Sequence, residues 1–260
     1  MRTFAMPEIS TRTEGAIRIL TISNERKRNA FEGKMAADFL RLLNEAESDD
    51  AVRVIVVTGA GDIAFSSGHD LNEIASGAHA ESNLGEEPFL RPRSLHKPVI
   101  AAINGHCYAA ALILAVNCDL RVASRNATFG SPGARLGMLP EGGQIGRLPR
   151  LMASSRALEL MLTANPLHAD EAYRTGFINR LAEKGEALNE ALALARDIAK
   201  NSPSVVAAIK AGVILGELEG VGAAAAYEAT VARQLEKEAD AREGVSAFLE
   251  KRAPVFGGGE

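Results

Sequence analysis

The chain has 260 residues, of which 47% are apolar and 24% are charged, and its formal net charge at pH 7 is −4. Such a composition supplies the core of one large or two modest domains and is ordinary for a globular protein. The mildly negative charge and the lack of a long basic run argue against a nucleic-acid-binding surface.

The sequence also argues against a metal centre and a membrane span. Its two cysteines, Cys107 and Cys118, stand in apolar surroundings without a metal-binding spacing, and its five histidines are scattered. The N-terminus shows no apolar signal-peptide core, and the longest apolar run, Ala109–Val116, is too short to cross a bilayer. We therefore expect a cytoplasmic protein whose thiols are buried and reduced.

The first part of the chain alternates apolar strands with helices. Ala16–Ser23 alternates like a strand, Gly33–Ser48 carries apolar residues at helical spacing, and Val52–Thr58 is a short apolar strand typical of the middle of a sheet. Phe65 ends another short strand before a turn. Ser76–His96 shows the least pattern, and we expect a mobile loop or a broken helix there, of the kind that covers a binding site.

The stretch from Lys97 to Arg150 contains the clearest supersecondary pattern. A strand at Val99–Ile103, a helix at Ala109–Asn117 and a strand at Leu120–Ala123 predict a βαβ unit, and hence a parallel sheet covered by helices. The helix begins after a turn of small residues. Backbone N–H groups at such a helix start have no acceptor within the helix, so they can hold an oxyanion.

The second part of the chain becomes helical. Its expected elements are helices at Gly143–Met152, Ser155–Thr163 and Ala169–Thr175, a strand at Phe177–Leu181, and helices at Gly185–Asn201, from Pro203 onward, at Gly222–Glu238 and at Ala241–Arg252. Ser202 is placed to cap the helix that begins at Pro203. The change to helix near Asn201 separates an α/β core of residues 1–200 from a helical part of residues 201–260, whose apolar face has to pack on the core or on another subunit.

Several motifs, in this order and at this spacing, resemble the enoyl-CoA hydratase/isomerase (crotonase) superfamily. They are FSSGHDL, KPVIAAING followed by a small-residue turn and CDL, FG-x-P followed by LG-x-x-P and GG, and EGVSAFLEKR near the C-terminus. The resemblance covers almost the whole chain. It implies an α/β fold, a crotonase-like spiral of ββα units with a C-terminal helical oligomerisation region, assembled as a homotrimer or a dimer of trimers. It also implies an acyl-CoA thioester as substrate and no cofactor beyond the coenzyme A of that thioester.

The resemblance further implies the parts of the site. The backbone N–H groups of His69 and Ala110 fall where the family stabilises an enolate-like thioester oxygen, and two convergent donors act most strongly when charge develops on that oxygen. The expected coenzyme A contacts are Lys27, Arg28, Ala30, Ser67, Gly68 and Leu71, with Phe248 and Lys251 reaching across a subunit boundary. The basic loop is one residue shorter than in many relatives, which leaves the choice between Lys27 and Arg28 open, and a solvated surface role is the alternative for each.

Two positions depart from the family pattern. Ile113 and Gly133 stand where hydratases of the family place the two glutamates that activate and protonate water. Neither residue transfers a proton, so ordinary hydration is disfavoured. Glu141 matches the position where some isomerases and dehalogenases place an acid, and a carboxylate there can move a proton from the α-carbon of a thioester to another carbon. The alternative for Glu141 is to cap or charge the start of the following helix.

The sequence leaves three functions open. The first is enoyl-CoA isomerisation, or an atypical hydration, with Glu141 as the single acid–base group. The second is a catalytically inert acyl-CoA-binding homologue, and the third is a hydrolase that uses His69, His106 or Glu141. His106 and Tyr108 flank the oxyanion turn, where such residues are more often structural than catalytic.

Overall fold

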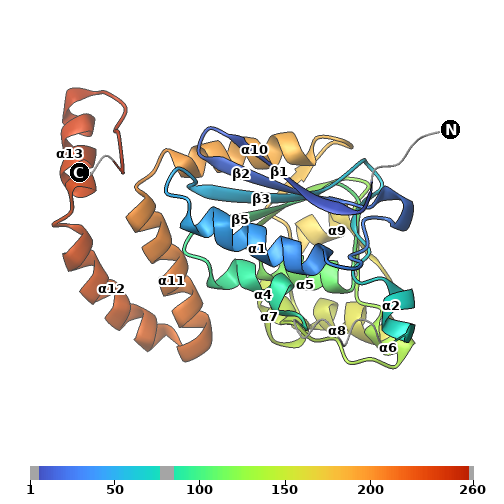
Figure 1. Cartoon of the computed structure of the whole chain (residues 1–260). Coiled ribbons are helices and arrows are strands. Elements are labelled where there is room, and N and C mark those ends of the chain that lie inside the picture. The colour runs from blue at the N-terminus through green and yellow to red at the C-terminus, as the bar shows by residue number, and fades with distance from the viewer. Residues whose placement is uncertain (1–5, 77–84, 258–260) are drawn as a thin grey trace.

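The structure, a computed structural model, describes residues 6–76 and 85–257 and is built around two sheets (Figure 1). The main sheet has six strands in the order β1 (Glu8–Glu14), β2 (Ile17–Ser23), β3 (Val54–Gly59), β5 (Val99–Ile103), β7 (Leu120–Ser124) and β10 (Arg180–Ala182). The second sheet has four short strands in the order β4 (Ala64–Ser66), β6 (His106–Tyr108), β8 (Thr128–Gly130) and β9 (Leu167–His168). In the main sheet β1 and β2 form an antiparallel hairpin, and every other neighbouring pair is parallel.

Helices surround both sheets and continue to the C-terminus. In chain order they are α1 (Met35–Ser48), α2 (Leu71–Ser76), α4 (Glu87–Ser94), α5 (Ala110–Asn117), α6 (Gly133–Leu136), α7 (Gln144–Leu151), α8 (Ser154–Thr163), α9 (Ala169–Arg174), α10 (Ala187–Ala199), α11 (Pro203–Glu219), α12 (Val221–Leu235) and α13 (Ala239–Glu250). No single helix in the described ranges is long and apolar enough to cross a membrane; α10 and α11 meet the length and composition test only as a pair bent by 109°.

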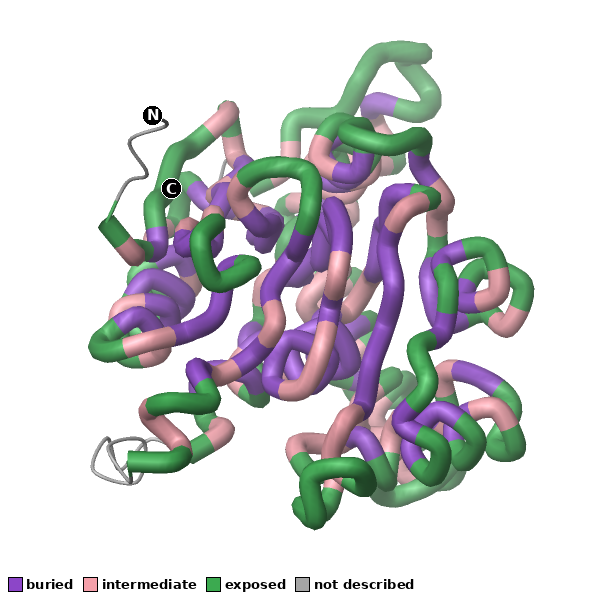
Figure 2. Tube along the Cα trace, turned by 90° about the vertical axis from the view of Figure 1, so that its right-hand side faces the viewer, coloured by how far each residue is buried: buried purple, intermediate pink, exposed green. Residues whose placement is uncertain are grey.

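The strands of the main sheet divide their side chains between two apolar cores. In β2, Ile17 and Ile19 join the core beneath α10, whereas Leu20 and Ile22 join the larger core that contains α1 and α5. The residues of β3 and β5 alternate in the same way, because successive side chains of a strand point to opposite faces. Figure 1 accordingly shows α10 on one face of the sheet and α1, α4 and α5 on the other. The buried strands therefore run through the interior while exposed turns surround them (Figure 2).

The predicted βαβ unit is confirmed. The parallel strands β5 and β7 flank α5, and all eight residues of α5 are buried. A helix buried on every side has no polar face, which explains why its sequence, AALILAVN, shows no amphipathic pattern. The α5 helix is thus a rigid element on which a site can be built.

Some sequence-based expectations were wrong or incomplete. Strands β1, β6 and β8 were not predicted; the last two are only three residues long, too short for a period-two pattern. The strand expected at Phe177–Leu181 is β10, at Arg180–Ala182, whereas Phe177 is a fully buried core residue. Ser76–His96, expected as a loop or broken helix, contains α4, which is anchored by the buried side chain of Phe89. Residues 77–84 of this stretch lie outside the described residues.

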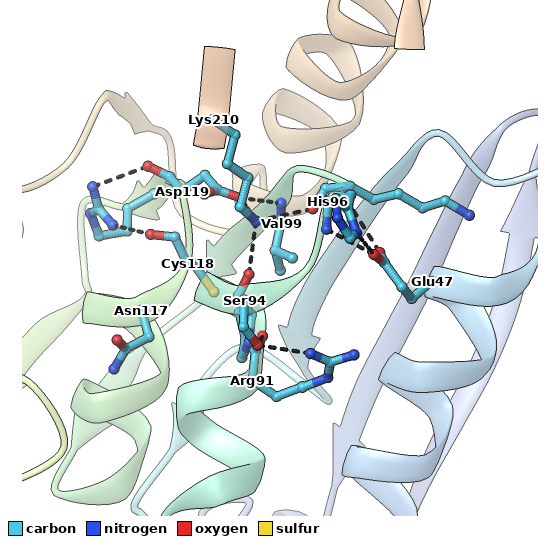
Figure 3. A network of polar contacts seen from close by, with 12 residues as sticks. Glu47, Arg91, Ser94, His96, Val99, Asn117, Cys118, Asp119 and Lys210 are labelled. Carbon is cyan, nitrogen blue, oxygen red and sulfur yellow. Dashed lines mark hydrogen bonds and ion pairs between the residues drawn. The ribbon is translucent and has the colours of Figure 1, made fainter. Parts of the chain in front are cut away.

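The C-terminal helices α11, α12 and α13 lie beside the α/β core (Figure 1). As predicted, the Ser202 side chain caps α11 by accepting a hydrogen bond from the Val205 N–H at 3.5 Å. The α11 helix is tied to the core by Lys210, whose ammonium group lies 2.8 Å from Asp119 Oδ2 and donates to the carbonyls of Pro92 and Lys97 (Figure 3).

Asp119 also connects this ion pair to the central strand. Its Oδ2 accepts a hydrogen bond of 2.7 Å from the N–H of Val99, the first residue of β5. Asp119 therefore has a structural role, and burial raises the pKa of its carboxyl group. One buried lysine thus joins a C-terminal helix to the central strand that precedes β6 and α5.

Candidate active site

A cavity of about 440 Å³ lies where the loop after β4, the turn between β6 and α5, and the segment from α6 to α7 meet. Most of its lining is apolar. The polar side chains in its wall belong to Ser67, His69, Glu86, Tyr108, Ser131, Glu141 and Gln144. An apolar cavity with a few polar groups is typical of a small-molecule site. The described residues contain no group of histidine, cysteine or acidic side chains that could hold a metal ion.

The loop that carries His69 is held in place through its backbone. A parallel bridge joins His69 to Phe31: the Phe31 N–H donates to the Gly68 carbonyl at 2.8 Å, and the Asp70 N–H donates to the Phe31 carbonyl at 2.9 Å. This bridge uses the groups on either side of the His69 N–H. Both His69 and Ala110 line the cavity.

The His69 loop and the start of α5 pack against each other without space for another atom. Gly68 has a φ of +89°, and a Cβ added there would lie 2.9 Å from the Ala110 nitrogen and 2.9 Å from Ala109 Cβ. Ala109 precedes α5 with φ 53° and ψ −121°, a conformation that L-residues rarely adopt. Such strain persists only where the surrounding structure enforces it and is concentrated at functional sites. The structure thus brings together the two segments whose N–H groups were predicted to form the oxyanion hole.

The two positions that lack the family's glutamates are occupied by close packing. Ile113 is buried on α5, and a Cβ at Gly142 would lie 2.4 Å from its Cγ2 atom. A Cβ at Gly133 would lie 2.6 Å from the Met138 carbonyl oxygen. Any larger residue at position 133 therefore requires the backbone near Met138 to move. The loop that follows α6 therefore packs against the Ile113 side chain through Gly142 and against Gly133 through the Met138 backbone.

Glu141 lines the cavity and is exposed. Its backbone carbonyl accepts hydrogen bonds from both the N–H and the side-chain amide of Gln144. The N-cap of α7 is Gly143, and no side chain caps this helix. The Glu141 carboxylate therefore does not cap α7, which excludes the capping half of the alternative and leaves its charge at the start of this helix.

Glu86 is a second carboxylate in the cavity wall, and sequence reasoning missed it. Its Oε1 lies 3.2 Å from His69 Nε2, and both side chains line the cavity. Glu86 falls in the stretch without periodic pattern and matches no motif, so the sequence offered no signal for it. Only the fold brings Glu86, from the segment before α4, next to His69.

His106 and Tyr108 have structural partners. His106 Nδ1 lies 2.7 Å from Thr128 Oγ1, and the Tyr108 hydroxyl lies 3.0 Å from the same oxygen. Burial, and to a smaller extent the nearby Arg28, lowers the pKa of His106. His106 is not among the residues that line the cavity. A hydrolase that uses His106 is therefore disfavoured.

Lys27 and Arg28, the two basic residues of the predicted coenzyme A loop, have different surroundings. Lys27 pairs with Glu32 and, at 2.5 Å, with Asp70, and these hydrogen bonds raise its pKa above the usual lysine range. Arg28 ends the short 3-10 turn in a left-handed conformation, and its carbonyl accepts the Ser67 N–H at 3.0 Å. Lys27 is thus engaged in ion pairs with its own chain next to His69, whereas the Arg28 guanidinium forms no ion pair with the residues that the structure describes.

The other predicted contacts fall in three places. Ala30 is buried, and its carbonyl accepts the Asn24 side-chain amide. Ser67 and Leu71 line the cavity. Phe248, 82% exposed, and Lys251 lie at the end of α13, which Figure 1 places at the opposite end of the molecule from α2. The structure therefore does not bring the last two residues to the cavity of the same chain.

Comparison with known proteins identifies the family of this chain. The family model for enoyl-CoA hydratase/isomerase matches residues 12–259. The chain is 34% identical to a short-chain-enoyl-CoA hydratase of Clostridium acetobutylicum over 92% of its own length and 93% of the relative. It is 33% identical to a 1,2-epoxyphenylacetyl-CoA isomerase of Escherichia coli over 97% of this chain and 99% of that protein.

Solved structures agree with these sequence relationships. The crystal structure of an enoyl-CoA hydratase from Bacillus anthracis superimposes with a TM-score of 0.92 at 28% identity, covering 96% of this chain and 99% of that one. An enoyl-CoA hydratase from Mycobacterium tuberculosis superimposes with a TM-score of 0.91 at 32% identity, covering 98% and 100%. The protein belongs to the enoyl-CoA hydratase/isomerase (crotonase) superfamily and is an acyl-CoA enzyme of that type with the α/β crotonase fold.

Proposed function

We propose that the protein shifts the double bond of an enoyl-CoA, with Glu141 as a proton-transferring carboxylate and the N–H groups of His69 and Ala110 as the oxyanion hole. One observation carries the proposal. Glu141 lines the same cavity as His69 and Ala110, while Ile113 and Gly133, in the same wall, bring no group that transfers a proton.

The chemistry needs a base beside an oxyanion hole. The Glu141 carboxylate removes a proton from C2 of a 3-enoyl-CoA, and the electron pair moves toward the thioester oxygen. The two N–H donors stabilise the charge on that oxygen, and each such donor is worth about 3 kcal/mol of barrier. Protonation of the dienolate at C4 then gives the 2-enoyl-CoA. The substrate and the product are isomers, so the reaction consumes no water.

Hydration is the less favoured reaction for this chain. It needs one group to activate water and another to protonate C2, and the two places where the family carries these groups hold Ile113 and Gly133. The named relatives include both a hydratase and an isomerase, so their names do not choose between the reactions. An inert acyl-CoA-binding protein is the alternative from a different functional class, and it requires binding without product.

The proposal assigns coenzyme A to the edge of the cavity near Arg28, Ser67, Gly68 and Leu71. We propose that Arg28 contacts the phosphates and that Lys27 holds the loop of His69, because Lys27 is already paired with Asp70 and Glu32. Ala30 contributes only its backbone.

The C-terminal residues 201–260 are proposed as the oligomerisation region of a homotrimer or a dimer of trimers. A groove of about 980 Å³ runs between α11 and α12 and is lined by apolar side chains such as Ile209, Val213 and Val221. These three side chains are 61%, 61% and 85% exposed in the single chain. Burying them against another subunit would remove this apolar surface from water and so stabilise the assembly. It would also allow Phe248 and Lys251 to reach coenzyme A bound to a neighbour.

We also propose a cytoplasmic location, in which Cys107 and Cys118 stay reduced. Both are free buried thiols, and burial raises their pKa values, to about 12 for Cys118. Thiols with raised pKa values are poor nucleophiles and metal ligands.

Turnover of matched substrates tests the proposed function. The wild-type protein is expected to convert 3-enoyl-CoA to 2-enoyl-CoA faster than it hydrates 2-enoyl-CoA. Glu141→Ala is expected to lower the kcat of isomerisation by about 100-fold or more. Glu8→Gln, which neutralises an exposed acid on β1, is the control and should change nothing. Binding of acyl-CoA without turnover of either substrate would favour the inert alternative, and an unaffected Glu141→Ala variant would contradict the role of Glu141.

A further inference from the structure

Glu86 occupies the N-cap position of α4 but does not cap it. Its carbonyl accepts the N–H groups of Phe89 and Leu90 at 3.0 and 3.1 Å, whereas its carboxylate makes no capping hydrogen bond. The carboxylate instead lies against His69, with Oε1 3.2 Å from Nε2. The side chains of His69 and Glu86 are 10% and 18% exposed. An acid at a helix start usually caps the helix, whereas the Glu86 carboxylate contacts His69 in the cavity wall instead.

The geometry of this pair is fixed by packing. Phe89, fully buried on α4, meets the His69 ring edge-to-face with centroids 5.0 Å apart. Phe89 also packs edge-to-face on Phe31, the residue that forms the backbone bridge to His69. The imidazole therefore has a supported orientation, which is what a residue that positions a reacting group requires.

One carboxylate oxygen of Glu86, Oε2, is buried and has no hydrogen-bond partner among the described residues. A buried polar atom without a partner costs about 1–3 kcal/mol and is rare in folded proteins. His69 holds Oε1, so the Glu86 carboxyl group, which lines the cavity, is only partly satisfied by hydrogen bonds.

We propose that Glu86, positioned by His69, is a second proton-transferring group of the cavity, which protonates C4 of the dienolate that Glu141 forms at C2. The proposal rests on the proposed isomerase function and changes its mechanism from one base to two. Glu86 contacts the substrate, and the side chain of His69 acts through Glu86.

The step balances without another reactant. Glu141 takes the C2 proton, and the C2–H electron pair passes into the dienolate. Glu86 gives its carboxyl proton to C4 as the oxyanion charge returns, so the C2–C3 double bond forms and the C3–C4 double bond is lost. Glu86 ends as the carboxylate and Glu141 as the acid, and proton exchange with solvent resets both groups.

Isotope transfer in heavy water distinguishes two bases from one. With two bases, the proton delivered to C4 comes from a group that equilibrates with solvent, so the 2-enoyl-CoA formed in D₂O carries deuterium at C4 in nearly every turnover. With Glu141 alone, protium moves from C2 to C4 within the complex. Predominant protium transfer by the wild-type protein, measured by mass spectrometry and NMR, would overturn the proposal whether or not any variant folds.

The variant Glu86→Gln separates the two steps. We expect isomerisation to fall by about 100-fold, while exchange of the C2 hydrogens of 3-enoyl-CoA with D₂O continues, because Glu141 and both N–H donors remain. Glu87→Gln, which changes the exposed neighbouring acid, should alter neither rate. His69→Leu keeps the backbone N–H and removes the contact with Oε1, so it should lower the ratio of isomerisation to exchange in the same direction.

Failure of the Glu86 proposal and failure of the proposed isomerase function give different results. Wild-type isomerisation rates in Glu86→Gln, or loss of C2 exchange together with isomerisation, would reject Glu86 as the C4 acid and leave Glu141 as the single base. Absence of both C2 exchange and isomerisation in the wild-type protein, or exchange that persists in Glu141→Gln, would instead reject the proposed function itself.

Discussion

The donor side and the acid side of the cavity are built in different ways. The donor side consists of residues 66–70 and 108–110, and its proposed functional groups are backbone N–H groups. The acid side consists of Glu86, Ile113, Gly133 and Glu141, and its chemistry depends on side chains alone. On the donor side, Gly68 and Ala109 fix the backbone by close contact and positive φ. On the acid side, two of the four positions carry no ionisable group.

This difference means that the fold itself maintains the backbone N–H groups, whereas the acidic side chains can change with single substitutions. A backbone N–H survives the exchange of one side chain for another, so the donor proposed at Ala110 does not depend on the identity of its side chain. A side-chain acid is lost with a single substitution, and Ile113 supplies none. In the proposed mechanism, the donor side stabilises the enolate intermediate and the acid side determines which reaction follows from it.

The largest expected effect concerns the support of the donor side. Lys210→Met leaves Asp119 without its cation beside the start of β5, and we expect the free energy of unfolding to fall by about 3 kcal/mol. Lys200→Met breaks an exposed pair with Asp197 and should cost at most about 0.5 kcal/mol. Urea titration of both variants provides the measurement. Equal losses would mean that the buried pair does not anchor α11 to the core.

Gly68→Ala tests the donor side directly. The added Cβ would lie 2.9 Å from the Ala110 nitrogen, so the two N–H groups should no longer converge. We expect kcat/KM to fall by about 100-fold, as for the loss of one oxyanion donor. Gly15→Ala imposes a similar positive φ in open space and serves as the control. A Gly68→Ala enzyme with full activity would contradict the assignment of these donors.

Arg28→Ala is expected to weaken substrate binding without affecting the chemical step. Loss of a charged hydrogen bond to a phosphate should raise KM by about ten-fold with kcat nearly unchanged. Steady-state kinetics with acyl-CoA, compared with the same acyl group on pantetheine, measures the effect. If the ten-fold loss persists with the pantetheine ester, Arg28 does not contact the phosphates.

Lys27→Met should have the smallest effect, and one that depends on pH. The Lys27 ammonium holds the pKa of Asp70 below its usual value of 3.8, so this pair stabilises the fold above that pH and loses its contribution as the pH falls through the folded-state pKa. We expect a Tm a few degrees below wild type near pH 6 and a difference that shrinks below pH 4. Lys34→Met, which breaks the exposed pair with Asp38, is the control. A raised KM with an unchanged Tm would instead return Lys27 to the coenzyme A site.

Much of the donor side could be predicted from the sequence, because its motifs are contiguous. The strand Val99–Ile103 and the helix Ala109–Asn117 have patterns that arise from burial, and the structure places them within one residue of the predicted bounds. The short strands β6 and β8 could not be predicted, since three residues carry no detectable period.

The acid side was only partly predictable. Glu141 follows a motif, whereas Glu86 approaches His69 only because α4 packs against α5 and α1. That contact is tertiary and leaves no local pattern in the chain. The engagement of Lys27 by Asp70 was hidden for the same reason, because the two residues are 43 positions apart in the sequence and meet only in the fold.

The central claim is that Glu141 and the donor side together form a thioester enolate. The most direct measurement is exchange of the C2 hydrogens of a saturated acyl-CoA, such as butyryl-CoA, with D₂O, because it requires no double bond and no second proton-transferring group. The wild-type protein is expected to catalyse this exchange, and Glu141→Gln to reduce it by about 100-fold or more while binding the ester with unchanged affinity. Equal exchange rates in the two proteins would contradict the claim.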